Sequence, residues 1–234
     1  MKKLLSLVLA SVLALTLCAC GDKVGKMLRN ADVGDTVTFG TYEQDNNEEN
    51  GKEAIEWTVL SKEENRVLLL SKYVIDCIPF NNELQEGIIW EDSSIREWLN
   101  SDFISTAFSE KEAAKIEETE NVNDPVSDYR IPEMPSTKEK VFFISINEIY
   151  EYFPRDTDTV FREESIAFPT EYAKEKGVEL RRDGAVMWWL RESTVDGRFG
   201  ACADDLGKRF HRGREMDRTD VGIRPAMWLT IENK

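Results

Sequence analysis

The chain has 234 residues, a hydrophobic fraction of 41% and a formal net charge of −15 at pH 7. This size and composition suit one globular domain with its own core and exclude wholesale disorder. The acidity also excludes nucleic acid as a partner, because phosphate binding needs a basic surface.

The N-terminus has the pattern of an export signal. Lys2 and Lys3 precede an apolar run that ends at Leu17, and this run is too short to span a bilayer core of about 30 Å. The following residues Leu17-Cys18-Ala19-Cys20 resemble the lipobox of bacterial lipoproteins, in which the last Cys is acylated and becomes the new N-terminus. Cys20 is the expected acceptor, because Ala19 is small and Leu17, before Cys18, is too large. A plain secretory signal cut near Ala19 is the alternative.

These features predict three segments. Residues 1–19 are expected to be a lipoprotein signal peptide, residues 20–33 a flexible tether, and residues 34–232 a single domain. The protein is therefore expected at the cell membrane, on its extracytoplasmic face. Its contact with the lipid bilayer would depend on the acylated Cys20, since two acyl chains anchor stably where one does not.

The first half of the domain reads as a strand meander followed by helices. Alternating or continuous apolar residues predict strands at Thr36–Gly40, Ile55–Leu60 and Val67–Leu70, the last of them central, with a polar loop at Glu43–Lys52. A helical pattern begins at Ser94 and continues to Phe108. Capping boxes at Ser109/Glu112 and Ser145/Glu148 predict helices over Glu110–Ile116 and Ile149–Phe153.

The second half is predicted to contain more strands. The stretch Glu120–Lys138 holds three prolines and is expected to be a long irregular loop. A short helix is expected over Thr170–Lys176, with Gly177 as its stop. Further strands are predicted at Val141–Ile144, Val186–Leu190, Gly200–Ala203 and Val221–Ile231. Helices and strands do not alternate regularly, which argues against a doubly wound parallel sheet.

Several segments together resemble a known family. They are Gly34–Tyr42, Ile55–Leu60, Trp90–Asn100, Trp188–Ser193 (WWLRES) and Gly222–Trp228 (GIRPAMW). In this order they resemble an uncharacterised family of bacterial extracellular lipoprotein domains over residues 33–231. That family is distantly similar to the C-type-lectin-like and formylglycine-generating-enzyme fold. The resemblance implies an α+β fold, with a twisted, mostly antiparallel sheet, flanking short helices and long loops.

The last third supplies the candidate binding residues. Neighbouring residues of a strand point to opposite faces, so one of Trp188 and Trp189 is expected in the core while the other can line a surface. Aromatic and arginine side chains are the usual anchors of recognition surfaces. The candidate ligand contacts are Trp188, Trp189, Arg198, Phe199, Arg212 and Arg214. Arg191 and Arg224 are expected to be structural and to pair with carboxylates.

The many arginines of this region alternate with acidic residues, which leaves two interpretations. One is a surface of ion pairs, and the other is a locally basic face for an anionic ligand such as an acidic glycan. Asp204, Asp205, Asp217 and Asp220 are weak calcium candidates, because carboxylate oxygens suit that ion. Otherwise no cofactor is expected.

No catalytic residues are predicted. His211 is the only histidine, which excludes multi-histidine zinc and iron sites. Cys77 and Cys202 can be a disulfide outside the cytoplasm or two buried thiols. The favoured function is therefore a non-catalytic domain that binds an extracellular glycan or protein. The alternatives are an extracellular enzyme of the formylglycine-generating type that uses Cys202, and a purely structural envelope protein. The formylglycine-generating relatives use a pair of cysteines close to the C-terminal strands, where this chain has only Cys202.

Overall fold

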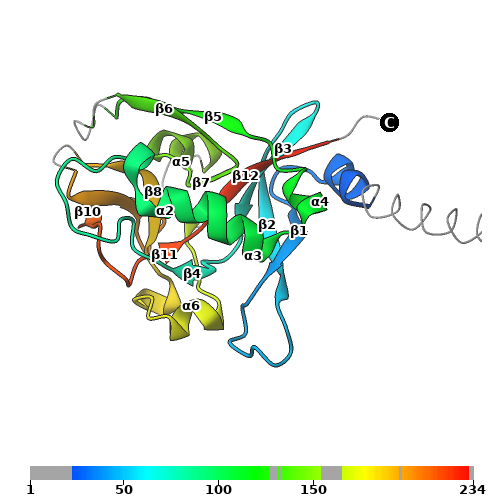
Figure 1. Cartoon of the computed structure of the whole chain (residues 1–234), viewed down its shortest axis with the longest axis horizontal. Helices are drawn as coiled ribbons and strands as arrows, with labels where there is room; N and C mark the ends of the chain where they lie inside the picture. The colour runs from blue at the N-terminus through cyan, green and yellow to red at the C-terminus, as the bar shows by residue number, and fades with distance from the viewer. Residues whose placement is uncertain (1–22, 127–130, 132, 154–164, 195–196, 232–234) are drawn as a thin grey trace, which may run out of the picture.

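The computed structural model describes residues 23–126, 131, 133–153, 165–194 and 197–231, without the side chains of residues 209–212. It has two five-stranded sheets, a two-stranded ribbon and short helices around them (Figure 1). The predicted signal peptide and Cys20 lie outside the described residues. The α+β class with mostly antiparallel sheets is as predicted.

The first sheet has the strand order β1-β2-β3-β12-β7, with every neighbouring pair antiparallel. Its strands are β1 (Thr36–Tyr42), β2 (Glu53–Lys62), β3 (Arg66–Ser71), β12 (Ala226–Thr230) and β7 (Val141–Phe142). The predicted meander is confirmed. Residues Val67 to Leu70 of β3 are all buried, as a central strand requires.

The second sheet has the order β10-β9-β8-β11-β4. Its strands are β10 (Arg209–Glu215), β9 (Phe199–Ala203), β8 (Trp188–Ser193), β11 (Gly222–Ile223) and β4 (Asp76–Cys77). β11 lies parallel to β8, with Gly222 opposite Trp188, and the other pairs are antiparallel. The GIRP segment therefore lies beside the tryptophan strand, at β11.

The predicted single strand Val221–Ile231 is wrong. The chain leaves the second sheet after Ile223 and enters the first at Ala226, so that β11 and β12 belong to different sheets. Pro225 lies at this crossing and has no N–H for a ladder. Its carbonyl accepts a hydrogen bond from the Ser71 amide at 2.9 Å, which fixes the crossing on β3.

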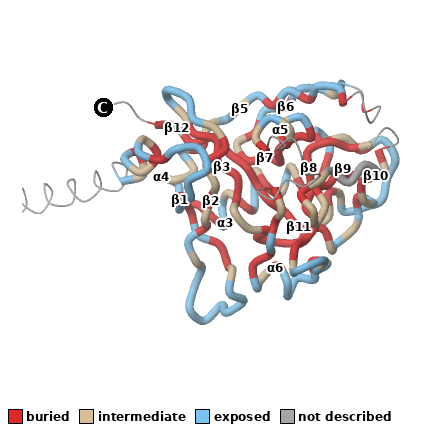
Figure 2. Tube along the Cα trace, turned by 180° about the vertical axis from the view of Figure 1, so that it is seen from behind, coloured by how far each residue is buried: buried red, intermediate tan, exposed pale blue. Residues whose placement is uncertain are grey.

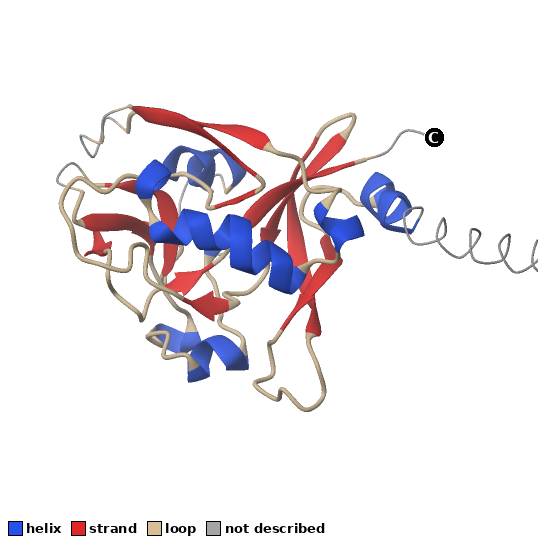
Figure 3. Cartoon of the chain, in the orientation of Figure 1, coloured by secondary structure: helices blue, strands red, loops and turns tan. Residues whose placement is uncertain are grey.

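The helices are short and lie around the sheets (Figure 3). They are η1 (Trp90–Asp92), α2 (Ser94–Trp98), the π-helical turn η2 (Leu99–Phe103), α3 (Ile104–Ala107), α4 (Glu110–Ala113), α5 (Ile146–Tyr152), α6 (Glu171–Glu175) and η5 (Arg182–Gly184). Both capping boxes are confirmed, at Ser109/Glu112 and Ser145/Glu148. Thr170 caps α6, and Gly177 follows it at φ +103°.

The stretch predicted to be a long irregular loop instead contains a β-ribbon. β5 (Thr119–Asn123) and β6 (Met134–Glu139) pair antiparallel over the top of the molecule in Figure 1. The loop was expected because this stretch holds three prolines. Proline is excluded from central strands, but an edge strand such as those of a ribbon tolerates it. Pro135 stands on a two-stranded ribbon, and its carbonyl accepts from the Asn123 side chain at 2.7 Å.

The expected tether is wrong for residues 23–31. Residues 23–30 form a helix, and Leu28 is fully buried against the domain. Lys62 Nζ donates to the Arg29 carbonyl at 2.8 Å and to the Ala31 carbonyl at 2.7 Å, which holds the end of this helix. Figure 2 shows that the buried residues gather along the strands and that the loop between β1 and β2 and much of the ribbon are exposed.

Candidate binding groove

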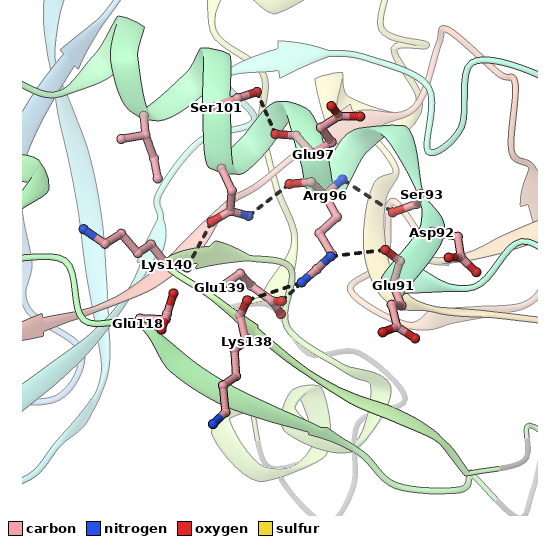
Figure 4. A pocket seen from close by; sticks show the side chains of 12 residues that line it. Glu91, Asp92, Ser93, Arg96, Glu97, Ser101, Glu118, Lys138, Glu139 and Lys140 are labelled. Carbon is pink, nitrogen blue, oxygen red and sulfur yellow. Dashed lines mark hydrogen bonds and ion pairs between the residues drawn. The ribbon is translucent and has the colours of Figure 1, made fainter.

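A groove of about 530 Å³ lies between the helical segment α2–η2 and the β5–β6 ribbon. Figure 4 shows this site, with the helix above and the ribbon below. All of its lining residues except Ile104 are polar or charged, although the carbon atoms of these side chains make up the larger part of the exposed lining; the residues are Glu91, Asp92, Ser93, Arg96, Glu97, Asn100, Ser101, Ile104, Glu118, Lys138, Glu139 and Lys140. A hollow of this size with many hydrogen-bonding groups suits a polar ligand.

The floor of the groove is organised by the buried carboxylate of Glu139. Its Oε1 accepts hydrogen bonds from Trp90 Nε1 at 3.1 Å, Asn121 Nδ2 at 2.8 Å and Thr137 Oγ1 at 2.9 Å. Asn121 and Thr137 come from the two strands of the ribbon, and Trp90 comes from η1. The carboxylate therefore ties both walls together, and its hydrogen bonds compensate its loss of water.

Arg96 fixes the helical wall to this floor. Its Nε donates to Glu139 Oε2 at 2.8 Å, its Nη1 to the Glu91 carbonyl at 3.1 Å and its Nη2 to the Lys138 carbonyl at 3.3 Å. These contacts are visible in Figure 4 as dashed lines from the guanidinium. Arg96 is thus a structural link whose charge is already matched by Glu139.

The helical wall is widened by the π-helical turn η2. Such turns leave backbone carbonyls without their usual partners and are frequent at functional sites. Here the side chains of the turn donate hydrogen bonds to nearby backbone carbonyls. Ser101 Oγ donates to the Glu97 carbonyl at 2.8 Å, and Asn100 Nδ2 donates to the Arg96 carbonyl at 3.0 Å and to the Val141 carbonyl at 2.8 Å. Asn100 Oδ1 also accepts from the amides of Lys140 and Val141.

A second recess, of about 330 Å³, lies on the other flank of the same helix. It is lined by Ile78, Asn82, Ser94, Glu97, Trp98, Ser101 and Asp102. Glu97 and Ser101 line both hollows, so the two form one polar surface over the helix. Trp98 is half-buried, and its ring centroid lies 5.5 Å from that of Phe103. An indole placed so keeps part of its surface for contact with a ligand.

Residues 64–231 match a protein family described as "Domain of unknown function (DUF6273)". The match spans more than half of the chain and includes the whole groove. The chain belongs to the DUF6273 family. No curated protein and no solved structure matches the chain.

Both tryptophans of the segment WWLRES, which lies in the matched region, are in the core, so the expectation that one of them lines a surface is wrong. Trp188 and Trp189 are each 0% exposed. The Trp188 indole N–H donates to the Ser165 carbonyl at 3.3 Å, and that of Trp189 donates to the Ile78 carbonyl at 3.0 Å. Alternation places the two rings on opposite faces of β8, but this strand is covered on both faces.

The remaining predicted ligand contacts gather on the β9–β10 hairpin and just before it. Arg198, Phe199 and Arg214 are partly buried, and the side chain of Arg212 lies outside the described residues. Arg214 Nη2 lies 3.8 Å from Glu179 Oε2. Arg181 also pairs with Glu179, and Arg218 pairs with Asp220. This surface of ion pairs agrees with the first of the two interpretations of the arginine-rich region.

Arg191 and Arg224 are both buried, but among the residues that the structure describes only Arg191 has the expected carboxylate partner. Arg191 Nη1 lies 3.1 Å from Glu148 Oε2, and its Nε donates to Asn123 Oδ1 at 2.8 Å. Arg224 Nε donates to the Ser71 carbonyl at 2.7 Å, and its guanidinium lies 5.1 Å from the centroid of Trp188. Burial lowers the pKa of Arg224 to about 9. The expected ion pair of Arg224 is therefore wrong, since backbone carbonyls and a ring face take its place.

The four calcium candidates do not form a cluster. Asp204 Oδ1 accepts from the amides of Leu206 and Lys208 and closes the β9–β10 turn, while Asp220 pairs with Arg218. Within the described ranges, the only acidic group compact enough for a cation is Glu43, Asp45 and Glu53, whose oxygens lie within 4.8 Å of one another. These carboxylates accept hydrogen bonds from Asn47, Asn50 and Gln44 and so shape the loop.

The two cysteines are separate buried thiols and form no disulfide. Cys77 lies on β4 and Cys202 on β9, with β11 and β8 between them. Burial raises the pKa of Cys77 to about 12 and raises that of Cys202, which is 0% exposed, still further. A thiol in this state is a poor nucleophile at neutral pH, because the thiolate is the reactive form.

Another buried acid that sequence reasoning missed is Glu192. Its Oε1 accepts from the Ile146 amide at 2.7 Å, while its Oε2 and the neighbouring Ser193 Oγ have no hydrogen-bond partner. Burial raises the pKa of Glu192 to about 7. Both residues line a cavity of about 10 Å³ under the ribbon, which is about the room that one water molecule needs.

Among the helices of the described ranges, none is long and apolar enough to cross a membrane.

Proposed function

We propose that this protein is a lipoprotein of the extracytoplasmic membrane face whose domain binds a saccharide in the groove beside α2–η2, without catalysis. The observation that carries the proposal is the groove itself. It is a hollow with carboxylates, an amide and hydroxyls on its walls, carbon atoms of the same side chains between them, and Trp98 in the adjoining recess. Sugars offer many hydroxyls and a flat apolar ring face, and these two features match such a lining.

The anchor rests on the sequence around Cys20, which has a small residue before it and an apolar run upstream. The test is metabolic labelling of cells with a fatty-acid analogue, followed by fractionation. Cys20→Ala is expected to lose the label and leave the membrane fraction. Cys18→Ala is the matched control and is expected to keep both. A label that survives in Cys20→Ala would overturn this part of the proposal.

The groove is tested by blocking it. Ser101 is exposed, borders both recesses and donates its hydroxyl to a carbonyl of its own helix. Ser105, one turn onward, is also exposed and makes the same kind of bond to the Asp102 carbonyl, but it lines neither recess. Ser101→Trp is therefore expected to abolish binding on a glycan array, while Ser105→Trp is expected to keep it.

Either of two array results contradicts the assignment. In the first, the wild-type protein recognises no glycan. In the second, both tryptophan variants keep the pattern of the wild type, so that recognition lies elsewhere on the surface. Circular dichroism of the three proteins ensures that a loss of binding is not a loss of fold.

The finer fold assignment, a C-type-lectin-like domain, is part of this proposal. What supports it is the return of the C-terminal strand β12 to the sheet of β1, β2 and β3, together with the parallel pairing of β11 and β8. An experimental structure of the domain, superposed on lectin-like folds, tests it. A different strand order in the matched region would contradict it.

The two alternatives from the sequence have less support. An enzyme that uses Cys202 needs a reachable thiolate, and that thiol is fully buried with a raised pKa. A purely structural spacer does not account for a hollowed polar surface beside a π-helical turn.

A further inference from the structure

The charges on the groove are unbalanced, and this imbalance bears on the ligand. Its three cationic side chains are already engaged. Arg96 pairs with Glu139 at 2.8 Å, Lys138 Nζ lies 4.0 Å from Glu120, and Lys140 Nζ donates to the Ala113 carbonyl at 2.9 Å. Only Arg96 has its charge matched by a buried carboxylate, and the five carboxylates that line the groove outnumber its three cations.

Most carboxylates that line the two recesses, in contrast, have no ion-pair partner among the described residues. Glu91, Asp92, Glu97 and Glu118 line the groove, and Asp102 lines the second recess. All five are exposed, and within the described part of the chain no lysine or arginine lies within ion-pair distance of any of them. This excess of negative charge attracts a ligand that carries positive charge.

Trp98 adds a second contact suited to a cation. It lines the same recess as Asp102 and Glu97. A cationic group over an indole face is attracted by the ring, and a nearby carboxylate adds to that attraction. An ammonium group in this recess would thus meet an aromatic ring and two carboxylates.

The backbone around the groove disfavours a peptide as the ligand. Peptides commonly bind by adding a strand to a free edge or by filling apolar pockets. Here the Lys138 carbonyl is taken by Arg96 Nη2, and the amides of Lys140 and Val141 are taken by Asn100 Oδ1. The only apolar side chains among the lining residues are Ile104 in one recess and Ile78 with Trp98 in the other. The lining thus combines polar side-chain groups with the carbon atoms beside them and lacks a deep apolar pocket, which suits sugars.

We propose that the groove binds a polysaccharide that carries free primary amines, such as a de-N-acetylated amino-sugar polymer. This inference rests on the proposed saccharide-binding function and gives it a ligand class. It replaces the acidic glycan considered from the sequence, because Arg181, Arg214 and Arg218 lie beside carboxylates, while four of the five carboxylates that line the groove have no ion-pair partner among the described residues.

The test compares two matched probes, the hexamer of glucosamine and the hexamer of N-acetylglucosamine, by calorimetry with the full chain in mild detergent. The amines are protonated at about pH 6, and low salt limits screening. We expect the glucosamine hexamer to bind at least about tenfold more tightly than its acetylated counterpart, which corresponds to about 1.4 kcal/mol.

Charge variants test which carboxylates cause the preference for the glucosamine hexamer. Glu97→Gln combined with Asp102→Asn removes two charges beside Trp98, and it is expected to weaken glucosamine binding at least about tenfold. Glu48→Gln combined with Glu49→Gln removes two exposed charges from the loop between β1 and β2 and serves as the control. The control is expected to change the affinity less than about twofold.

The outcomes distinguish the claim that the groove binds a saccharide from the claim that this saccharide carries free amines. Equal affinities for the two hexamers, both lost in Ser101→Trp, would leave the saccharide function standing and overturn the amine. An equal loss in both charge variants would show general attraction to an acidic surface and overturn the inference. A hexalysine peptide that binds as tightly as the glucosamine hexamer, and only with Glu97 and Asp102 intact, would make the ligand a cationic peptide and overturn the sugar. If neither hexamer binds while the array shows another glycan in the groove, only the amine claim falls.

Discussion

The guanidinium of Arg96 on α2 donates to the buried carboxylate of Glu139 on β6 at 2.8 Å, and this ion pair joins the two walls of the groove. The two side chains are 25% and 2% exposed, so the pair lies at the bottom of the hollow. Glu139 also holds Trp90, Asn121 and Thr137. The shape of the groove therefore depends on a single carboxylate.

We predict that Glu139→Ala lowers the free energy of unfolding by about 2–3 kcal/mol, because it leaves several buried donors and a guanidinium without their acceptor. Urea denaturation at neutral pH measures this. Glu120→Ala, which removes an exposed carboxylate 4.0 Å from Lys138, is expected to cost less than about 0.5 kcal/mol. Similar losses in the two variants would contradict the role given to Glu139.

A second prediction concerns Glu192, whose pKa is raised by burial from 4.5 to about 7. The folded protein holds this proton more tightly than the unfolded chain does. The free energy of unfolding therefore falls as the pH rises from about 4.5 to about 7 and is level above that range. We expect the wild type to lose about 1–3 kcal/mol between pH 5 and pH 8 through this group, and Glu192→Gln not to lose it.

Urea denaturation of both proteins at the two pH values tests this prediction. The pKa of Asp76 is also raised by burial and gives a slope of the same sign, but Asp76 is present in both proteins. The difference between the two slopes therefore reports on Glu192 alone. Parallel pH dependences would show that the buried acid does not titrate as described.

A third prediction concerns Gly40, which has φ +68° where β1 passes the end of α3. A Cβ at this position would lie 2.4 Å from Phe108 Cε1 and 2.8 Å from the Ala107 carbonyl. Gly40→Ala is expected to cost about 2–4 kcal/mol from the clash together with the strained backbone. Gly51→Ala shares the positive φ but meets no atom within 4 Å, and is expected to cost about 1 kcal/mol. Thermal or urea unfolding compares the two, and equal costs would contradict the close approach.

A fourth prediction follows from the buried thiols. Neither Cys77 nor Cys202 is expected to react with iodoacetamide in the folded protein at pH 7, because both are buried and their pKa values are raised. In urea both are expected to react. Peptide mapping by mass spectrometry reads each cysteine separately. Rapid alkylation of Cys202 in the folded protein would contradict this prediction and support the alternative of an enzyme that uses Cys202.

Much of the fold was predictable because local patterns and tertiary structure agree. The meander of β1–β3, the two capping boxes and the stop at Gly177 each have a local signal in the sequence. The ribbon at Thr119–Glu139 had no such local signal. Pro225 does indicate a break in the strand, but it does not indicate that the residues after it join the other sheet. These strands depend on distant partners and on which sheet edge is free, neither of which a local pattern contains.

The groove was not predicted, since its residues are distant in sequence and individually ordinary. Glu139 reads as one more acid in an acidic chain, and only the fold brings Trp90 and Arg96 to it. Trp188 and Trp189 drew attention because tryptophans in a distinctive motif suggest function. Their strand is covered on both faces, so they form core instead. The helical pattern from Ser94 was visible, but its π-helical turn was not.

The most direct test of the groove as the binding site is hydrogen–deuterium exchange of the full chain, with and without a saturating glycan identified on the array. We predict slower exchange over residues 91–104 and 137–140, which border the groove. Protection confined to residues 198–215, on the arginine-rich hairpin, would contradict the account.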